Sequence, residues 1–367
     1  MTKYFSRHWL ASALVVFCVV FSAGSFAEKA SEPSSVGLAI ASWNIERLGH
    51  GSNKDYAALG VVGSHFDFLA VQEMMTEEGA ALLEDVLEKS TGEPWERLVS
   101  HRLGRSSYRE MYAFFWREKR VEYLDGAVVY LDPGDLFARE PYSARFRDLS
   151  TGDEFAVATV HIVYGKRISD RTEEIEELAR YWDWLHEIYP DTPVVLMGDF
   201  NLKPQHPAWQ PLREAGAEPL ILDGATTLSG AEGRYANLYD NIWIKDVRLL
   251  SIREVGIFKF PRLLDISHEE ARRHVSDHAP IYLLTASAQL RGAVPISTAR
   301  MEMQTDSAMA SPAQSRGSII GHKHSKILHR PDCPSYSRIS EKNRVYFQSV
   351  QDGVEAGYRL ANNCPES

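Results

Sequence analysis

The sequence predicts one large domain that mixes strands and helices, followed by a small second module. Apolar runs of strand length, such as residues 38–41 and 66–71, alternate along the chain with amphipathic stretches. Two of these stretches, residues 77–88 and 171–188, have the spacing of helices. Trp182 and Trp184 belong to the second stretch, where helical spacing favours packing over base stacking. We take residues 37–285 as the main domain.

The first 27 residues have the pattern of a secretory signal. Lys3 and Arg7 precede an apolar stretch at residues 9–21, and Ser25-Phe26-Ala27 offers small residues for cleavage. The apolar stretch is shorter than the about 20 residues that a membrane span requires. We therefore expect a secreted or periplasmic protein that has no membrane span after cleavage and is a monomer.

The chain is acidic, with a formal net charge of −10, and loss of residues 1–27 would remove two cations and no acid. Because phosphate contacts dominate nonspecific affinity for DNA, the overall charge argues against a nonspecific DNA-binding protein. Basic residues nevertheless gather locally around Glu110 and after His161. Solvated loops are the alternative interpretation, but we expect a rim that contacts phosphate, formed by Arg102, Arg105, Arg109, Lys166, Arg167 and Arg171.

Two short strings carry most of the functional information. Residues 195–201 form an apolar run that breaks at a glycine and delivers Asp199 and Asn201; in an extended chain these two side chains would face one site. Asp277 and His278 place an acid and an imidazole side by side. Oxygen ligands for a hard cation, together with an acid and a base near neutral pH, are what hydrolysis of a phosphate ester requires.

Polar residues at other expected strand ends complete the set. Each motif alone is weak evidence, but together and in this order they are strong evidence for one cleft. These residues are Asn44, Glu73, Tyr108, Glu110, His161 and Asp240.

In this order the motifs resemble those of the endonuclease/exonuclease/phosphatase superfamily. The segment 107–112, Ser-Tyr-Arg-Glu-Met-Tyr, is similar to its counterpart in the deoxyribonuclease I branch. The resemblance covers about residues 37–284. It implies an α+β fold, a four-layer sandwich in which two packed, mostly antiparallel sheets lie between helices, with the active site at one edge of the sheets.

The resemblance also implies roles for the matching residues. Glu73, with Asn44 beside it, would bind Mg²⁺ or Mn²⁺, and Asp277 would be a second metal-binding or water-orienting carboxylate. His161 and His278 would form the proton-transfer pair, and the sequence leaves open which is the acid and which is the base. The orienting acids would be Glu110 for His161 and Asp240 for His278.

Other residues are expected to handle water and substrate. Asp199 would orient or deprotonate the attacking water, or bind a metal. Substrate contacts are expected from Asn201, Tyr108, Arg109, Arg105 and Lys166. One position departs from the deoxyribonuclease I pattern, because Met75 stands where that enzyme has an arginine that enters the minor groove.

The function predicted from these residues is a secreted, metal-dependent endonuclease that hydrolyses DNA with little sequence preference and leaves 5′-phosphate ends; RNA is the alternative nucleic acid. A sphingomyelinase-like lipid phosphodiesterase of the same superfamily is a second candidate, but the sequence offers no Trp/Phe hairpin for a membrane. A non-catalytic DNA-binding or adhesion protein is a third, and the intact set of polar residues argues against it.

Beyond the main domain, residues 286–318 are rich in Ala, Ser and Gln and are expected to be a flexible linker. Residues 319–367 form a small α+β module that resembles the zinc-bearing Ada-type domain. That family uses four cysteines, whose places are taken here by His329, Cys333, Ala361 and Cys364.

Two interpretations of this module compete. Cys333 and Cys364 form a disulfide, or they bind zinc with His329 and with His322 or His324. A structural zinc site normally needs four ligands. An exported protein meets an oxidising compartment, so we favour the disulfide.

Overall fold

The computed structural model describes residues 36–51, 53–231, 233–292 and 319–361, with gaps at 324, 334–335, 337–338, 340–342 and 348, and also residue 364. The predicted signal at residues 1–27 and most of the predicted linker lie outside the described residues.

Two six-stranded sheets form the main domain. The first has the strand order β11-β12-β1-β2-β4-β3, with bounds Ile252–Ile257, Ile281–Thr285, Ala39–Leu48, Phe68–Met74, Met111–Arg117 and Trp95–Val99. The second has the order β5-β6-β7-β8-β10-β9, with bounds Val121–Val129, Tyr142–Asp148, Glu154–His161, Val194–Asp199, Asp240–Ile244 and Glu218–Pro219. All neighbouring pairs are antiparallel except β1–β2 and β7–β8.

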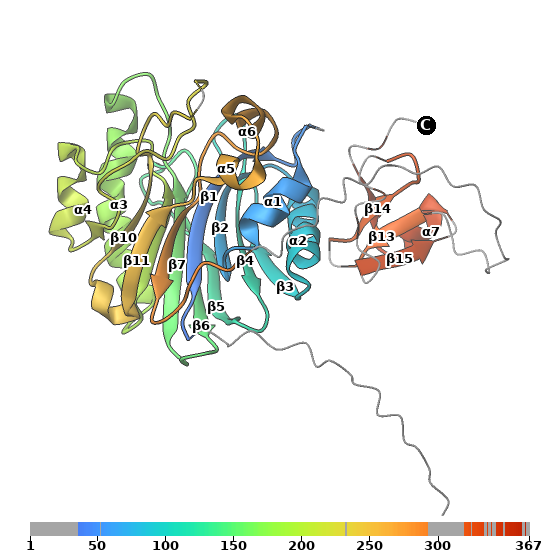
Figure 1. The fold of residues 1–367 in the computed structure, drawn as a ribbon, viewed down its shortest axis with the longest axis horizontal. Coiled ribbons are helices and arrows are strands. Elements are labelled where there is room, and N and C mark those ends of the chain that lie inside the picture. Colours follow the sequence, from blue (N-terminus) through green and yellow to red (C-terminus); the bar gives the residue numbers. More distant parts are fainter. Residues whose placement is uncertain are drawn as a thin grey trace, which may run out of the picture. The chain divides into compact units, whose positions relative to one another are not determined.

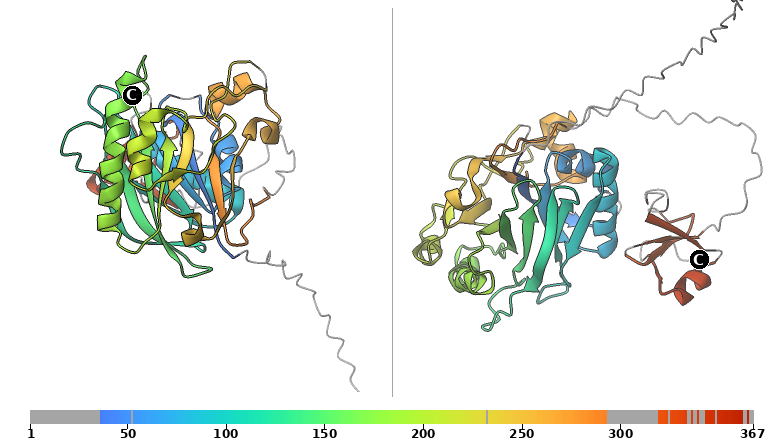
Figure 2. Two further views of the ribbon diagram at one scale, coloured as in Figure 1. Left: turned by 90° about the vertical axis from the view of Figure 1, so that its left-hand side faces the viewer. Right: turned by 90° about the horizontal axis from the view of Figure 1, so that it is seen from below.

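Helices cover the outer face of each sheet, and α3 and α4 lie on the opposite side of the strands from α1 and α2 (Figure 1). The right-hand view of Figure 2 shows the same layers from below. Beside the first sheet lie α1 Tyr56–Gly63, α2 Glu77–Thr91, α5 Phe260–Leu264 and α6 His268–His274. Beside the second lie α3 Ser169–Ile188, η1 Pro207–Trp209 and α4 Gln210–Glu214, and η2 Val247–Leu250 leads from β10 into β11. The predicted α+β four-layer sandwich is confirmed.

Alternate residues of the central strands face different layers, as the period of two in a strand requires. In β1, Ile40 packs in the cluster between the sheets, whereas Trp43 packs with residues of α1 and α2. In β8, Met197 faces the central cluster and Leu196 packs with α3. Because both faces are buried, these strands need unbroken apolar runs, which is the pattern seen in the sequence.

The two predicted helices are present with slightly wider bounds. α2 begins after Thr76, whose hydroxyl accepts a hydrogen bond from the amide of Gly79. Two glutamates in the first turn of α2 interact favourably with the positive end of the helix dipole. α3 extends the second predicted helix to Ser169–Ile188. Trp182 is buried against the second sheet, so it is a packing residue as expected.

The directions of the strands bring distant parts of the chain to one edge. The parallel pairs β1–β2 and β7–β8 end with their carboxyl ends side by side. β4, β10 and β12 run antiparallel to their neighbours, so their first residues lie at that same edge. Residues that end the parallel strands and residues that precede the antiparallel ones therefore converge.

The C-terminal module has its own four-stranded sheet, in the order β15-β13-β14-β16, and one short helix, α7 Val350–Glu355. Its strands are Arg344–Phe347, Ile319–His322, Ile327–His329 and Arg359–Leu360. Cys333 and Cys364 are joined by a disulfide, and a ring nitrogen of His329 lies within 4.8 Å of both sulfurs. His324 lies outside the described residues, and the Ada-type resemblance of the module stays a prediction.

No helix among the described residues is both long enough and apolar enough to span a membrane.

Candidate active site

A cleft of about 510 Å³ opens at the edge where the strand ends converge. It brings together residues predicted from separate motifs: Glu73, His161, Asp199, Asn201, Asp277 and His278. Asn44, Glu110 and Asp240 are buried directly behind them, and each is bonded to one or more of these side chains.

Asp199, the last residue of β8, lies at the centre of the cleft. Its Oδ2 atom is 3.6 Å from Nε2 of His161 and 3.7 Å from Nε2 of His278. The same oxygen accepts a hydrogen bond of 3.2 Å from the side-chain amide of Asn44. The carboxylate is buried, so it acts on both imidazoles with little screening by water.

His161 belongs to a buried group of three charged side chains. Its Nδ1 atom is 2.8 Å from Oε1 of Glu110, and Arg139 lies 3.6 Å from that same oxygen while also donating to the carbonyl of His161. Burial and the Arg139 cation lower the pKa of His161, but the carboxylates of Glu110 and Asp199 outweigh them and raise it above the ordinary value. Burial raises the pKa of Glu110, but His161 and Arg139 outweigh burial, so the pKa of Glu110 is below its ordinary value.

His278 is held in a matching arrangement on the other side of Asp199. Its Nδ1 atom is 2.7 Å from Oδ2 of Asp240, the first residue of β10, which pairs in register with Asp199. Burial lowers the pKa of His278, but Asp240 and Asp199 raise it well above the ordinary value. Ser276 and Trp43 fix the loop, because Ser276 accepts from the His278 amide and Trp43 donates to its carbonyl.

A second group of carboxylates lies at the ends of β1 and β2. Glu73 accepts hydrogen bonds of 3.1 Å from the Asn44 amide, the Arg47 backbone and the Tyr108 hydroxyl. Its backbone has φ of +58°, a strained conformation that turns the side chain toward the cleft.

Glu46 is a further acid at this end of the cleft. Burial and the negative charge of Asp277 raise the pKa of Glu46, against the opposing cation of Lys54, and Glu73 adds to the rise. This concentration of negative charge suits an oxygen-ligated divalent cation.

Asp199 and Asn201 do line one cleft, but not by the extended geometry predicted for them. β8 ends at Asp199, and Asn201 has φ of +50°, in the left-handed region. The chain turns because Oδ1 of Asp199 accepts a hydrogen bond of 2.9 Å from the Asn201 backbone amide. The Asn201 side-chain amide donates a hydrogen bond of 2.8 Å to the carbonyl of Ile162.

The predicted basic rim lies less centrally than the acids and histidines. Arg105 pairs with Asp135 at 3.1 Å and with Asp132 at 3.8 Å. Arg109 and Lys166 are exposed, and like Arg105 they are not among the described residues that line the cleft. Met75, two residues after Glu73, is buried. Among the described residues that line the cleft, Arg272 of α6 is the Arg or Lys side chain.

Sequence reasoning missed several residues of the site. Glu46 follows Asn44 by two positions, but its φ of +43° departs from the extended backbone, so the alternation of a strand does not place it. Tyr239 directly precedes Asp240, and Tyr164 follows His161 by three residues; both line the cleft. Arg139 lies in the connection between β5 and β6 and carried no local signal.

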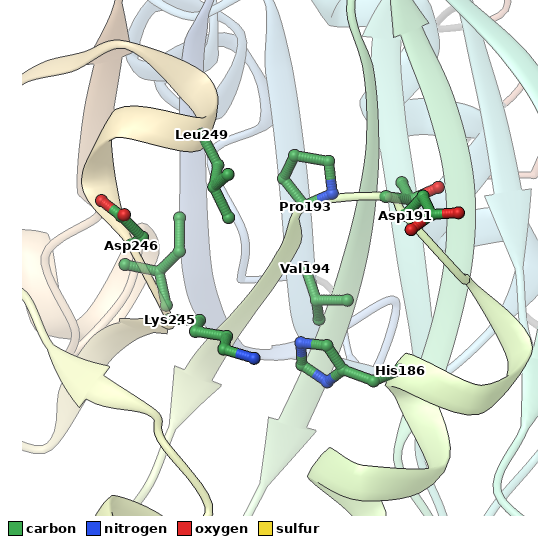
Figure 3. A pocket seen from close by; sticks show the side chains of 9 residues that line it. His186, Asp191, Pro193, Val194, Lys245, Asp246 and Leu249 are labelled. Atoms are coloured by element: carbon green, nitrogen blue, oxygen red, sulfur yellow. The ribbon is translucent and has the colours of Figure 1, made fainter.

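A second hollow, of about 620 Å³, lies at the other end of β8 (Figure 3). His186, Val194 and Lys245 are among its lining residues, and the Lys245 side chain extends toward the His186 ring. Val194 begins β8 and Asp199 ends it, so at about 3.3 Å per residue the two are roughly 17 Å apart. Because no predicted catalytic residue is among the described residues that line it, we assign no catalysis to this hollow.

The fold and the cleft agree with comparisons to known proteins. The chain belongs to the Endonuclease/Exonuclease/phosphatase family, whose sequence model matches residues 41–278. It is therefore a hydrolase that acts on phosphodiester bonds. This confirms the predicted superfamily and its deoxyribonuclease I-like branch.

Individual relatives support this branch. A deoxyribonuclease from Thioalkalivibrio sp. (strain K90mix) is 50% identical over 273 residues, which cover 72% of this chain and 75% of that protein. Deoxyribonuclease-1 from Bos taurus is 30% identical over 265 residues, covering 66% and 90% of the two chains. A solved endonuclease/exonuclease/phosphatase family protein from Bacteroides thetaiotaomicron has 16% identity and a TM-score of 0.51, covers 69% of this chain and 99% of its own, and supports the fold alone.

Proposed function

We propose that this protein is a secreted or periplasmic, metal-dependent endonuclease that hydrolyses DNA with little sequence preference and leaves 5′-phosphate ends. The observation that carries this proposal is the pair of carboxylate-held histidines whose Nε2 atoms both face Asp199 in one open cleft. DNA is favoured as the substrate because the relatives at 50% and 30% identity are named deoxyribonucleases.

The acidic end of the cleft fits a magnesium ion, or manganese in its place. Glu73 and Asp277 offer carboxylate oxygens and Asn44 offers a carbonyl oxygen, which are the donors that hard divalent cations prefer. The raised pKa of Glu46 supports the fit, since a cation would relieve the repulsion among these acids. A metal bound there would supply positive charge to the phosphoryl oxygens of the substrate.

The chain's own residues would supply proton transfer on either side of the phosphate. One imidazole takes a proton from the attacking water, which Asp199 orients. The other gives a proton to the departing O3′ atom as the P–O3′ bond breaks, so the phosphate stays on the O5′ atom of the downstream fragment. Glu110 and Asp240 fix the ring orientation of the two histidines. Because both rings face Asp199, they should titrate as a coupled pair.

A lipid substrate is less well supported. A sphingomyelinase-like phosphodiesterase would be expected to carry a hairpin with exposed Trp or Phe side chains that touch the membrane. Among the described residues, no Trp or Phe is a strongly exposed side chain. Export is supported by the signal-like first 27 residues and by the disulfide of the C-terminal module, since disulfides persist in oxidising compartments.

The experiment that tests this function incubates the full mature chain with supercoiled plasmid and Mg²⁺, with and without a chelator. We expect nicked circles that turn linear, loss of cleavage with the chelator, and recovery when Mg²⁺ or Mn²⁺ is restored. Labelling of the ends by a kinase only after phosphatase treatment would report 5′-phosphates. Intact plasmid after incubation with the folded protein and either metal would contradict the proposal.

A further inference from the structure

Tyr164 is an exposed aromatic side chain on the wall of the catalytic cleft. Its side chain is 62% exposed, and no other Tyr, Trp or Phe in the described part of the chain is exposed to that extent. It lies three residues after His161 and lines the cleft with His161, Asn201 and Tyr239. A large ring left in water beside catalytic groups is unusual for a packing residue.

The neighbours of Tyr164 hold its ring in place. The guanidinium of Arg171 lies 5.1 Å from the ring centroid, within the range of a cation–π contact. Arg171 is itself buried and fixed, because it donates hydrogen bonds to the backbone carbonyls of Asn201 and Gly165. Since Asn201 belongs to the catalytic cleft, the position of the ring is tied to the position of the site.

A second aromatic ring extends this surface. Tyr239 lines the same cleft, and its ring centroid is 6.4 Å from that of Tyr164, with the ring planes inclined by 56°. Tyr239 is anchored next to the orienting acid Asp240, and its carbonyl accepts a hydrogen bond from the Phe200 amide. The two rings therefore stand on backbone that also carries catalytic side chains.

We propose that Tyr164, with Tyr239 beside it, forms a stacking subsite for an unpaired nucleobase next to the scissile phosphate. Aromatic side chains bind single-stranded nucleic acid in this way because every base has a π-face, whatever its sequence. Bases inside a duplex have both faces covered by their neighbours, so only a base outside the stack can use the ring. The subsite therefore selects single-stranded DNA, or strand ends and loops, without selecting a sequence.

This inference rests on the proposed DNA-hydrolysing function and specifies its substrate form. The pre-set ring would lower the entropy cost of ordering the strand, since no side chain has to be fixed on binding. Loss of one base–aromatic stack corresponds to a reduction in kcat/KM of about tenfold. The loss should appear mainly in KM, because the ring contacts the substrate away from the bond that breaks.

The test compares kcat/KM for a single-stranded oligodeoxynucleotide and for the matching duplex, in Mg²⁺, with the full mature chain. Tyr164→Ala is expected to lose about tenfold on the single strand and less than about twofold on the duplex. Tyr164→Phe and Tyr164→Trp keep a ring and should stay within about twofold of wild type on the single strand. The matched control is Leu131→Ala, which truncates an apolar residue that is 86% exposed and lies outside the cleft. This variant should leave kcat/KM unchanged on both substrates.

An unchanged single-strand rate in Tyr164→Ala would overturn the subsite, and so would equal losses of this variant on both substrates. Failure of Tyr164→Phe and Tyr164→Trp to restore the single-strand rate would overturn it as well. A wild-type chain that is folded, as judged by thermal unfolding, but cleaves neither substrate would instead contradict the proposed function. The two failures are therefore distinguishable.

Discussion

At the scale of single residues, the cleft combines each histidine with one carboxylate behind it and a shared carboxylate in front. Glu110 and Asp240 lie 2.8 and 2.7 Å from the Nδ1 atoms of His161 and His278, and Asp199 faces both Nε2 atoms. This arrangement fixes the ring orientations and raises both histidine pKa values. The orienting acids should therefore control the pH at which the protein works.

Asp240→Asn tests that control. Asp240 raises the pKa of His278, so removal of its charge should lower that pKa and move the corresponding limb of the pH–rate profile to lower pH. The acidic limb moves if His278 is the base, and the alkaline limb moves if it is the acid. The measurement is kcat/KM between about pH 5 and 10 at fixed Mg²⁺.

Asp246→Asn is the matched control for this variant, because Asp246 is paired with Arg248 at the surface and lines the other hollow. Its profile should coincide with that of wild type. An Asp240→Asn profile in which neither limb moves would show that the carboxylate does not govern the titration of His278.

The sequence predicted the acids and histidines of the site better than its basic residues. Asn44, Glu73, His161 and Asp199 end apolar runs, and strand ends meet at a sheet edge whatever the details of the loops. Arg105 was expected in the rim because it precedes Glu110, but in the structure it pairs with Asp135. Position within a loop depends on tertiary contacts, which sequence separation does not report.

At the scale of elements, the site depends on the close approach of β7 and β8. These strands run in parallel, with Val160 opposite Gly198 and His161 opposite Asp199. A Cβ atom at Gly198 would overlap the backbone oxygen of Val160, and the glycine has φ of +146°. The absence of a side chain here lets His161, the candidate catalytic histidine, and the central Asp199 lie side by side.

Gly198→Ala should therefore lower both stability and activity. The overlap with Val160 is expected to reduce the free energy of unfolding by about 2–3 kcal/mol, and displacement of Asp199 should slow cleavage by about tenfold or more. Gly216→Ala is the matched control, since Gly216 also has positive φ, at +93°, but has open space where the Cβ would be. It should cost only about 1 kcal/mol of backbone strain and leave the cleavage rate unchanged.

Urea unfolding and initial plasmid-nicking rates would measure both effects. If Gly198→Ala and Gly216→Ala had the same stability and rate, close packing of β7 on β8 would not position the site.

Element types were more predictable than the local backbone at the site. Unbroken apolar runs correctly indicated strands, and the two amphipathic stretches became α2 and α3. The left-handed conformations of Glu73 and Asn201 were not predictable, because neither residue is a glycine and the turn at Asn201 is set by a hydrogen bond to Asp199. The four-layer arrangement came from the family resemblance and not from periodicity.

At the scale of the whole molecule, the described cleft is complete within one domain. Packing of this domain continues past β12, since Arg291 donates to Asp67 at 2.7 Å and its backbone amide donates to the carbonyl of His65. Asp67 also lies 3.6 Å from Arg117 and 3.7 Å from Arg120, so Arg291 joins a buried charge network. A chain that keeps Arg291 should therefore keep the whole domain.

A chain ending at Gly292 should retain metal-dependent cleavage at close to the full rate. All the catalytic candidates precede this residue, and the C-terminal module has its own sheet. The measurements are plasmid-nicking rates and thermal unfolding of the shortened and full mature chains. A shortened chain that is folded but wholly inactive would show that the module contributes to the active site.

The central claim is that phosphodiester hydrolysis takes place between His161 and His278. The most direct test is the initial rate of plasmid nicking in Mg²⁺ by His161→Ala and His278→Ala, with His186→Ala as a histidine control from the second hollow. We predict a loss of at least about 10²-fold for each of the first two variants, the usual effect of removing a positioned acid or base, and a wild-type rate for the third. Near-wild-type nicking by either folded cleft variant would contradict the account.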